Sequence, residues 1–154
     1  MKRILLAIVL AILFCLLAKS LFADEIYPDS NMTPGATFNV TKEQVCTLGY
    51  SKSVRHVTKK LKRKVYHEYH MSRIPSKCCE IDHFIPLELG GSNDIKNLWP
   101  ETFPTAYWKD IVENYLHNEV CQNRLTLEEA QKLIVNDWYK VYLEIKRRKT
   151  NGKT

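Results

Sequence analysis

The residues of this 154-residue chain whose types and spacing could do chemistry are Asp82, His83 and Asn97. They stand in the stretch EIDHFIPLELGGSNDIKNLWPE, which runs from Glu80 to Glu101. A histidine, with an unperturbed pKa of about 6.5, can take a proton from water near neutral pH. A carboxylate can hold a divalent cation, which stabilises the negative charge that develops when a phosphodiester is attacked. The three side chains therefore suit phosphodiester hydrolysis, and an ordinary β-hairpin is the alternative interpretation.

A β-hairpin is the element that must bring these side chains together. Consecutive residues on a regular strand point to opposite faces, so Asp82 and His83 can meet one phosphate only if the backbone bends. A wide loop with a Gly90-Gly91 turn makes such a bend possible. Short apolar runs predict one strand over residues 78–86 and a second over 95–99. Asn97 lies on the second strand, where its amide can hydrogen-bond the loop backbone and fix the imidazole.

Three helical patterns accompany the hairpin. Between residues 53 and 70, apolar residues recur every three or four positions with lysines on the outer side, at Val54, Val57, Leu61, Val65 and Tyr69. A second pattern follows Pro104, and its apolar face is Tyr107, Ile111, Tyr115, Leu116 and Val120. A third begins at Thr126 with a capping box completed by Glu129, and its stripe is Leu127, Ala130, Leu133, Ile134, Trp138, Val141 and Ile145. This order predicts an α+β fold, a mostly helical single domain whose catalytic core is a β-hairpin plus a helix.

The ends of the chain lie outside this domain. Lys2-Arg3, an uncharged run over residues 4–18 and a small-residue exit at Ala23 are typical of a secretory signal peptide over residues 1–23. The run is shorter than the roughly 20 residues of a membrane span, and an uncleaved anchor is the alternative. Residues 24–52 read as an extended lead-in, 53–148 as the functional domain and 149–154 as a basic tail. We therefore expect a secreted or periplasmic protein without stable membrane association after cleavage.

Basic residues are concentrated in two clusters. Loss of the signal peptide would remove Lys2, Arg3 and Lys19 and lower the formal charge from +6 to +3, which is too small to name a partner. One cluster lies on the first predicted helix and the other at residues 146–149. Such clusters suit phosphate backbones, and solvated helix surfaces are the alternative. The candidate nucleic-acid-binding residues are Arg55, Lys59, Lys60, Lys62, Arg63, Lys64 and Lys109. For Arg55 and Lys109, pairing with acidic side chains is the alternative.

Cysteine usage fits export. Of the five cysteines, Cys15 lies in the signal peptide, and the four that follow are Cys46, Cys78, Cys79 and Cys121. In an oxidising compartment an even number predicts disulfides, and four cysteines allow three connectivities, which the sequence leaves open. No C-x-x-C pair occurs, which argues against a zinc ribbon. We interpret the four cysteines as structural.

The hairpin stretch resembles the HNH endonucleases. DHFIPLELGG, from Asp82 to Gly91, and NLWPE, from Asn97 to Glu101, are similar to an exported bacterial branch that pairs DHxIPLELGG with NLWPE. TPGA at residues 33–36 and EEAQ at 128–131 extend the resemblance over most of the mature chain. The resemblance implies a hairpin and a helix around one divalent metal ion, with Mg²⁺ expected first and Mn²⁺ or another divalent ion as an alternative.

The resemblance also implies roles for individual residues. His83 would be the general base, Asp82 a metal ligand and Asn97 the residue that orients His83. The last ligand of the family lies on the helix after the hairpin, at a position that is Ala106 in this chain. The nearest helical histidine is His117, which we expect to be the second metal ligand.

Other residues of the same region could take part in the metal site. Glu113 lies four residues before His117 and so shares its helix face, and Asn114 is the next residue. These two are the alternatives to His117 as the ligand. Glu88, in the hairpin loop, could hydrogen-bond the metal ligands without binding the metal itself, or it could be an ordinary loop acid.

The expected function is that of a metal-dependent endonuclease that hydrolyses nucleic acid, DNA before RNA, with low sequence specificity and 5′-phosphate products. The expected form is a monomer. Two other classes are alternatives. One is an exported protein that binds nucleic acid through its basic clusters without cutting it. The other is a structural envelope protein whose hairpin is similar to the nuclease motif in sequence but has no catalytic role.

Overall fold

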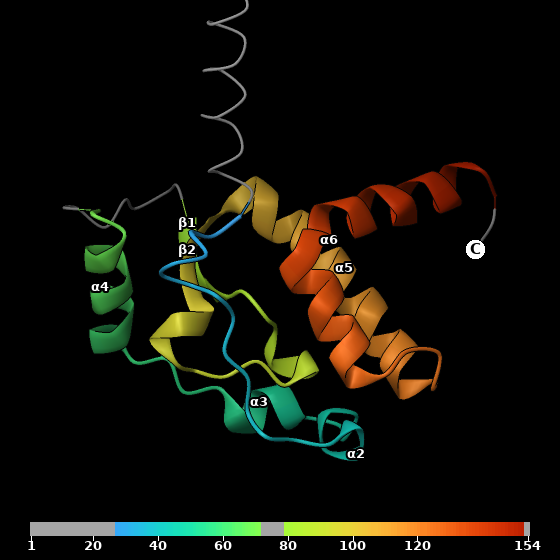
Figure 1. Ribbon diagram of the computed structural model, residues 1–154, viewed down its shortest axis with the longest axis horizontal. Helices are drawn as coiled ribbons and strands as arrows, with labels where there is room; N and C mark the ends of the chain where they lie inside the picture. The colour runs from blue at the N-terminus through green and yellow to red at the C-terminus, as the bar shows by residue number, and fades with distance from the viewer. Residues whose placement is uncertain (1–26, 72–78, 153–154) are drawn as a thin grey trace, which may run out of the picture.

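A two-stranded antiparallel hairpin forms the centre of the molecule, with helices on both sides (Figure 1). The computed structural model describes residues 27–71 and 79–152, so the predicted signal peptide and Cys78 lie outside the described residues. The elements are α2 (Lys42–Val45), α3 (Tyr50–Val54), α4 (Lys59–Glu68), β1 (Cys79–His83), the 3₁₀ turns η1 (Leu87–Leu89) and η2 (Ile95–Asn97), β2 (Leu98–Thr102), α5 (Phe103–Cys121) and α6 (Leu127–Thr150). The protein is an α+β, mostly helical single domain, as predicted. No helix within these ranges is long and apolar enough to cross a membrane.

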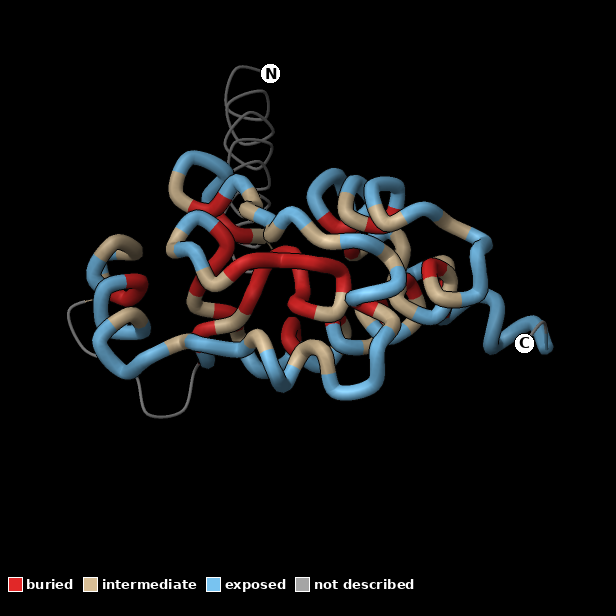
Figure 2. Tube along the Cα trace, turned by 90° about the horizontal axis from the view of Figure 1, so that it is seen from below, coloured by how far each residue is buried: buried red, intermediate tan, exposed pale blue. Residues whose placement is uncertain are grey.

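The hairpin lies between two apolar cores. One side packs against α4 through Ile81 and Leu98, and the other packs against α5 and α6 through Trp99. Figure 2 shows the buried stretch of chain in the middle of the molecule, with mostly exposed segments around it. His83 pairs with Leu98, and Asp82 pairs with Trp99. Because paired residues share a face of a sheet, Asp82 lies on the side that faces α5.

The second strand starts later than the sequence predicts. Residues 95–97 form the turn η2, and β2 covers residues 98–102. The carboxylate of Asp94 caps this turn by accepting a hydrogen bond from the N–H of Lys96 at 2.8 Å. Asn97 therefore lies in the turn that precedes β2 rather than within a strand.

The helix predicted over residues 53–70 is two helices. α3 ends at Val54, residues 55–58 are not helical, and α4 begins at Lys59. Thr58 starts α4 because its hydroxyl accepts a hydrogen bond from the N–H of Leu61 at 3.1 Å. The lead-in expected to be extended contains α2, which Thr41 and Gln44 open with a capping box. The break before α4 and the presence of α2 both depend on cap residues, and the spacing of apolar residues does not reveal caps.

The buried face of α5 agrees with the predicted one only in part. Its buried residues are Thr105, Ala106, Lys109, Val112, Leu116 and Val120. Tyr107, which belonged to the predicted stripe, is 66% exposed. Leu116 and Val120 belong to the predicted stripe, and the apolar pattern missed the rest of the face because Lys109 lies at its centre.

α6 begins at the predicted capping box and bends in the middle. Thr126 and Glu129 exchange hydrogen bonds, which confirms the box. Asp137 is extended, with φ −171°, and its carboxylate accepts a hydrogen bond from the N–H of Lys140 at 3.0 Å. Asp137 thus acts as an N-cap for the second half of the helix, and Figure 1 shows the change of direction. Trp138, the next residue, is fully buried.

A disulfide joins the N-terminal segment to the end of α5. Cys46 and Cys121 are bonded, with their Cα atoms 5.7 Å apart. This pairing was one of those that the sequence left open, and Cys79 is disulfide-bonded as well. The bonds fit structural cysteines and are compatible with an extracellular or periplasmic location.

Candidate active site

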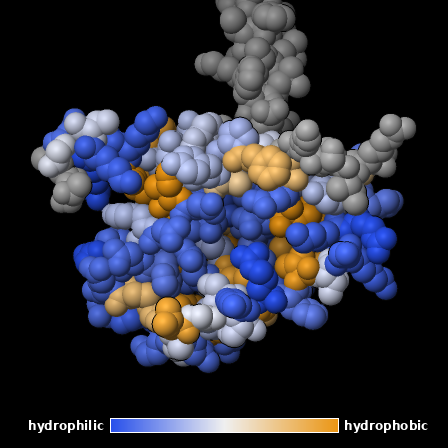
Figure 3. Space-filling model, turned by 180° about the vertical axis from the view of Figure 1, so that it is seen from behind, coloured by the Kyte–Doolittle hydropathy of each residue, from blue (hydrophilic) through white to orange (hydrophobic). Residues whose placement is uncertain are grey.

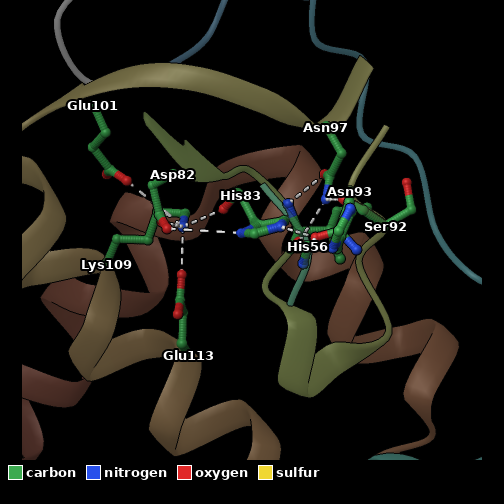
Figure 4. A network of polar contacts seen from close by, with 10 residues as sticks. His56, Asp82, His83, Ser92, Asn93, Asn97, Glu101, Lys109 and Glu113 are labelled. Carbon is green, nitrogen blue, oxygen red and sulfur yellow. Dashed lines mark hydrogen bonds and ion pairs between the residues drawn. The ribbon is translucent and has the colours of Figure 1, made fainter. Parts of the chain in front are cut away.

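The imidazole of His83 is fixed at the end of β1 (Figure 4). The side chain is 2% exposed, and its Nε2 lies 3.2 Å from Oδ1 of Asn93. The same oxygen accepts a hydrogen bond from the N–H of His56, and the Asn93 amide nitrogen donates to the carbonyl of Val54. These two backbone groups decide which way the amide points, so Nε2 must donate its hydrogen to Oδ1. The lone pair of the neutral imidazole is therefore on Nδ1.

The Nδ1 atom of His83 faces Asp82. It is buried without a hydrogen-bond partner among the described residues, and it lies 4.0 Å from Oδ1 of Asp82. Burial lowers the pKa of His83 below its usual value, although the nearby Asp82 opposes this shift. The Asp82 side chain is 23% exposed. A neutral imidazole with a free lone pair in this position can take a proton from water.

Asn97 holds the backbone of the hairpin loop. Its side chain is fully buried, and Oδ1 accepts a hydrogen bond from the N–H of Ile85 at 2.8 Å. Its Nδ2 donates to the carbonyls of Ile85 and Ser92, each at 2.9 Å. The imidazole donates its hydrogen bond to Asn93 and not to Asn97, and Asn93 is a residue that the sequence analysis missed. Asn93 lies in the turn-forming run Ser92-Asn93-Asp94. The sequence therefore predicts a loop asparagine there and does not indicate a contact with His83.

Lys109 lies in the interior, where no substrate phosphate can reach it. Its side chain is fully buried, and Nζ donates to Oδ2 of Asp82 at 3.0 Å, to the carbonyl of His83 at 2.7 Å and to Oε1 of Glu113. A carboxylate oxygen of Glu101 lies 3.7 Å away. Burial alone would lower the pKa of Lys109, but these three carboxylates raise it well above its usual value. The predicted phosphate contact is thus wrong, and Lys109 is a charged residue inside the acidic cluster.

Glu101 is the least accessible acid of this cluster. Its side chain is fully buried on β2, on the side that faces α5. Burial raises the pKa of Glu101 to about 9, with Lys109 opposing and Asp82 adding to the shift. Glu101 is therefore protonated at neutral pH, and Asp82 is left as the anion, since Lys109 lowers the pKa of Asp82 against the effect of burial.

Stability should depend on pH through Glu101. Because the folded-state pKa is raised from 4.5 to about 9, the native state keeps a proton that the unfolded state loses. This contribution is complete below pH 4.5 and is lost as the pH rises toward 9. Glu101→Gln mimics the protonated acid. We expect its free energy of unfolding to rise relative to that of the wild type between pH 5 and pH 8, by at most about 1.4 kcal/mol per pH unit.

Urea denaturation at several pH values measures this difference. The matched control is Glu80→Gln, because Glu80 is exposed and lies directly opposite Glu101 in the hairpin. A constant difference between Glu101→Gln and the wild type across this pH range would show that Glu101 ionises normally.

The residues expected as the helix metal ligand are engaged elsewhere. Nε2 of His117 lies 3.1 Å from the carbonyl oxygen of Val45. Along the axis of α5, His117 comes about two turns, or about 12 Å, after Lys109. Asn114 is exposed and donates to the backbone carbonyl of Asp110 on its own helix. Of the three, Glu113 alone approaches Asp82, and it does so through the shared Lys109.

His117 belongs to a second group of metal-ligating types, away from His83. Its ring and the sulfurs of Cys46 and Cys121 place their ligand atoms within 4.8 Å of one another. The two sulfurs are bonded to each other, so neither is the thiolate that a metal requires. In the oxidised protein this group is a disulfide beside a histidine.

Carboxylates near Asp82 fit a hard cation better than this group does. Asp110 follows Lys109 on α5 and is exposed, and burial together with Asp82 raises the pKa of Asp110. Glu88 is half-buried, its Oε1 is buried without a hydrogen-bond partner among the described residues, and burial raises the pKa of Glu88. Oxygen ligands of this kind suit Mg²⁺ or Mn²⁺. Asp110, which the sequence analysis missed, and Glu88 are the acids whose pKa values respond to this group of charges, so they are candidate partners of Asp82 for a divalent ion.

Arg55, which follows α3, and the basic residues of α4 lie on the surface. Arg55 is exposed and follows Val54, the residue that holds Asn93, and its charge contributes to the lowered pKa of His83. The exposed residues of α4 are Lys59, Lys60, Lys62, Arg63 and Lys64. Residues 146–149 are exposed at the opposite end of the molecule in Figure 1. The face seen in Figure 3 is mostly hydrophilic, with apolar side chains in small separate groups.

No family model, no curated protein and no solved structure matches this chain.

Proposed function

We propose that this protein is a metal-dependent endonuclease of the HNH type that hydrolyses phosphodiester bonds in nucleic acid, with His83 as its general base. One observation carries the proposal. The imidazole is held at Nε2 by Asn93, and its free Nδ1 lies 4.0 Å from a carboxylate oxygen of Asp82, whose side chain is 23% exposed. A histidine with only a structural role would be expected to use both ring nitrogens when buried.

Each residue then has a defined part in the reaction. Nδ1 of His83 takes a proton from water, and the water oxygen attacks phosphorus. Oδ1 of Asp82 and the carboxylate of Asp110 would hold the divalent ion, and such an ion stabilises charge on the scissile phosphate and on the leaving oxygen. Arg55 lies where its guanidinium can bind a substrate phosphate. Departure of the 3′ oxygen leaves a 5′-phosphate on the product.

The exposed basic residues of α4 favour nucleic acid as the substrate. They follow Arg55 in the chain by four to nine residues, and such a run of exposed positive charge suits a phosphate backbone. The same residues support the second candidate, an exported protein that binds nucleic acid without cutting it. Binding without cleavage in any divalent ion would favour that candidate.

The test uses residues 24–154, oxidatively folded, with supercoiled plasmid and Mg²⁺ or Mn²⁺. Wild type is compared with Asp82→Asn and with Glu80→Gln, an exposed acid on the same strand. We expect cleavage by wild type and by Glu80→Gln, its loss with a chelator, and its loss in Asp82→Asn. Equal cleavage by Asp82→Asn, or cleavage that persists in chelator, would contradict the proposal.

A further inference from the structure

The ammonium group of Lys109 uses all of its donors inside the protein. Its three N–H groups bind Oδ2 of Asp82, the carbonyl of His83 and Oε1 of Glu113. Glu101 adds a further carboxylate at 3.7 Å. Figure 4 shows the ammonium in the middle of these groups, below the hairpin and above α5. Since no donor remains, Lys109 acts on the site and not on the substrate.

The two oxygens of Asp82 have different surroundings. Oδ2 binds Lys109 at 3.0 Å, while Oδ1 faces Nδ1 of His83 at 4.0 Å. A carboxylate held through one oxygen cannot rotate freely, so the direction of the other oxygen is fixed. The same ammonium binds the backbone of His83. One cation therefore fixes both the acid and the histidine of the proposed site.

We propose that Lys109 is a positioning residue that serves as a built-in cation, directing Oδ1 of Asp82 toward His83 and filling the centre of a carboxylate cluster that would otherwise bind a divalent ion. The expected effect of Lys109 on cleavage rests on the proposed nuclease function. Its effect on metal binding does not depend on that function.

The fold places the cation before any substrate arrives. Lys109 and Glu113 are four residues apart on α5, which puts them on one helix face. Asp82 and Glu101 come from paired strands and share the face of the hairpin that looks toward that helix. Lys109 thus joins the helix to the hairpin, and the joint is preformed.

Removal of the charge should leave the acidic groups of Asp82, Glu101 and Glu113 without a cation. Such groups either take up protons or bind another cation. Methionine has a similar length and no charge, so Lys109→Met creates this situation with little change in volume. At pH 8 we expect the variant to recruit one more Mn²⁺ ion per chain than the wild type, into the place of the ammonium.

The experiment counts bound Mn²⁺ by electron paramagnetic resonance and measures the thermal midpoint with and without Mn²⁺. It compares the wild type, Lys109→Met and the control Lys132→Met. Lys132 also pairs with a glutamate four residues away, Glu128, but is exposed. We expect an additional ion and a larger Mn²⁺-induced rise of the midpoint only in Lys109→Met. Plasmid cleavage by this variant should fall by about 10²-fold, because the bound ion does not reproduce the geometry.

The outcomes separate the two proposals. An equal number of Mn²⁺ ions in Lys109→Met and wild type would overturn the role of Lys109, whether or not the protein cuts nucleic acid. If Lys109→Met is unfolded without metal, Mn²⁺ should restore its folding, and failure to do so would overturn the role as well. Absence of cleavage by the wild type, with an additional ion in the variant, would instead count against the nuclease alone.

Discussion

Replacement of His83 by alanine is expected to lower the rate of phosphodiester cleavage by about 10²–10⁴-fold. The reason is that Nδ1 is the one lone pair of a neutral base beside Asp82 within the described part of the chain. Binding of nucleic acid should persist, since the exposed lysines of α4 are untouched. A plasmid-cleavage time course and a binding titration in Ca²⁺ measure the two effects separately.

The control for this variant is His67→Ala, because His67 is an exposed histidine on α4. Circular dichroism must show that both variants are folded, since His83 is buried. Cleavage by His83→Ala within threefold of the wild-type rate, set against the smallest expected loss of about 10²-fold, would remove His83 as the base. Equal loss in both variants would point to a general effect on binding.

The pH profile gives a second test of the same role. Burial lowers the pKa of His83, and a base is active only when it is deprotonated. The acid limb of kcat/KM should therefore lie below about pH 6.5, the value of an unperturbed histidine. An acid limb above this value would mean that another group is the base.

The sequence predicted the elements better than the contacts between them. The hairpin, the helix after it and the capping box at Thr126 follow from local patterns, and all three are present. Lys109 could not be recognised from such a pattern. Lys109 with Glu113 and Lys132 with Glu128 are both lysine–glutamate pairs at four residues' distance, yet one lysine is fully buried and the other is 66% exposed. The difference is made by the hairpin, which covers the first pair and not the second.

The choice between two asparagines shows the same limit. Asn93 and Asn97 are both in the loop that leads to β2, and either could reach the imidazole by spacing alone. The structure separates them because Asn93 is held by the segment after α3, through the carbonyl of Val54 and the N–H of His56. These partners lie 39 and 37 residues away in the chain. A contact of that kind is set by tertiary packing and is not visible in a motif.

Gly91→Ala is expected to destabilise the protein and to slow cleavage, although Gly91 is not itself part of the reaction. A Cβ at this position would lie 1.7 Å from the carbonyl oxygen of Ile85 and 2.8 Å from Nδ2 of Asn97. Room for it exists only if the buried hydrogen bonds of Asn97 are broken, and each such bond costs about 1–3 kcal/mol when a partner is left unsatisfied. The free energy of unfolding should therefore fall by about 3 kcal/mol or more. The loop that carries Asn93 would shift with it and release the imidazole.

The matched control is Gly49→Ala, which separates lost contacts from backbone strain. Gly49 has a φ of +85° and nothing within 4 Å of an added Cβ, so alanine there should cost only about 1–2 kcal/mol of left-handed strain. Gly91 has no such backbone conformation, so its cost comes from the clash alone. Urea denaturation and plasmid cleavage of both variants make the comparison. If Gly91→Ala were no less stable than Gly49→Ala and cut at the wild-type rate, the loop clamped by Asn97 would not be what holds His83 in place.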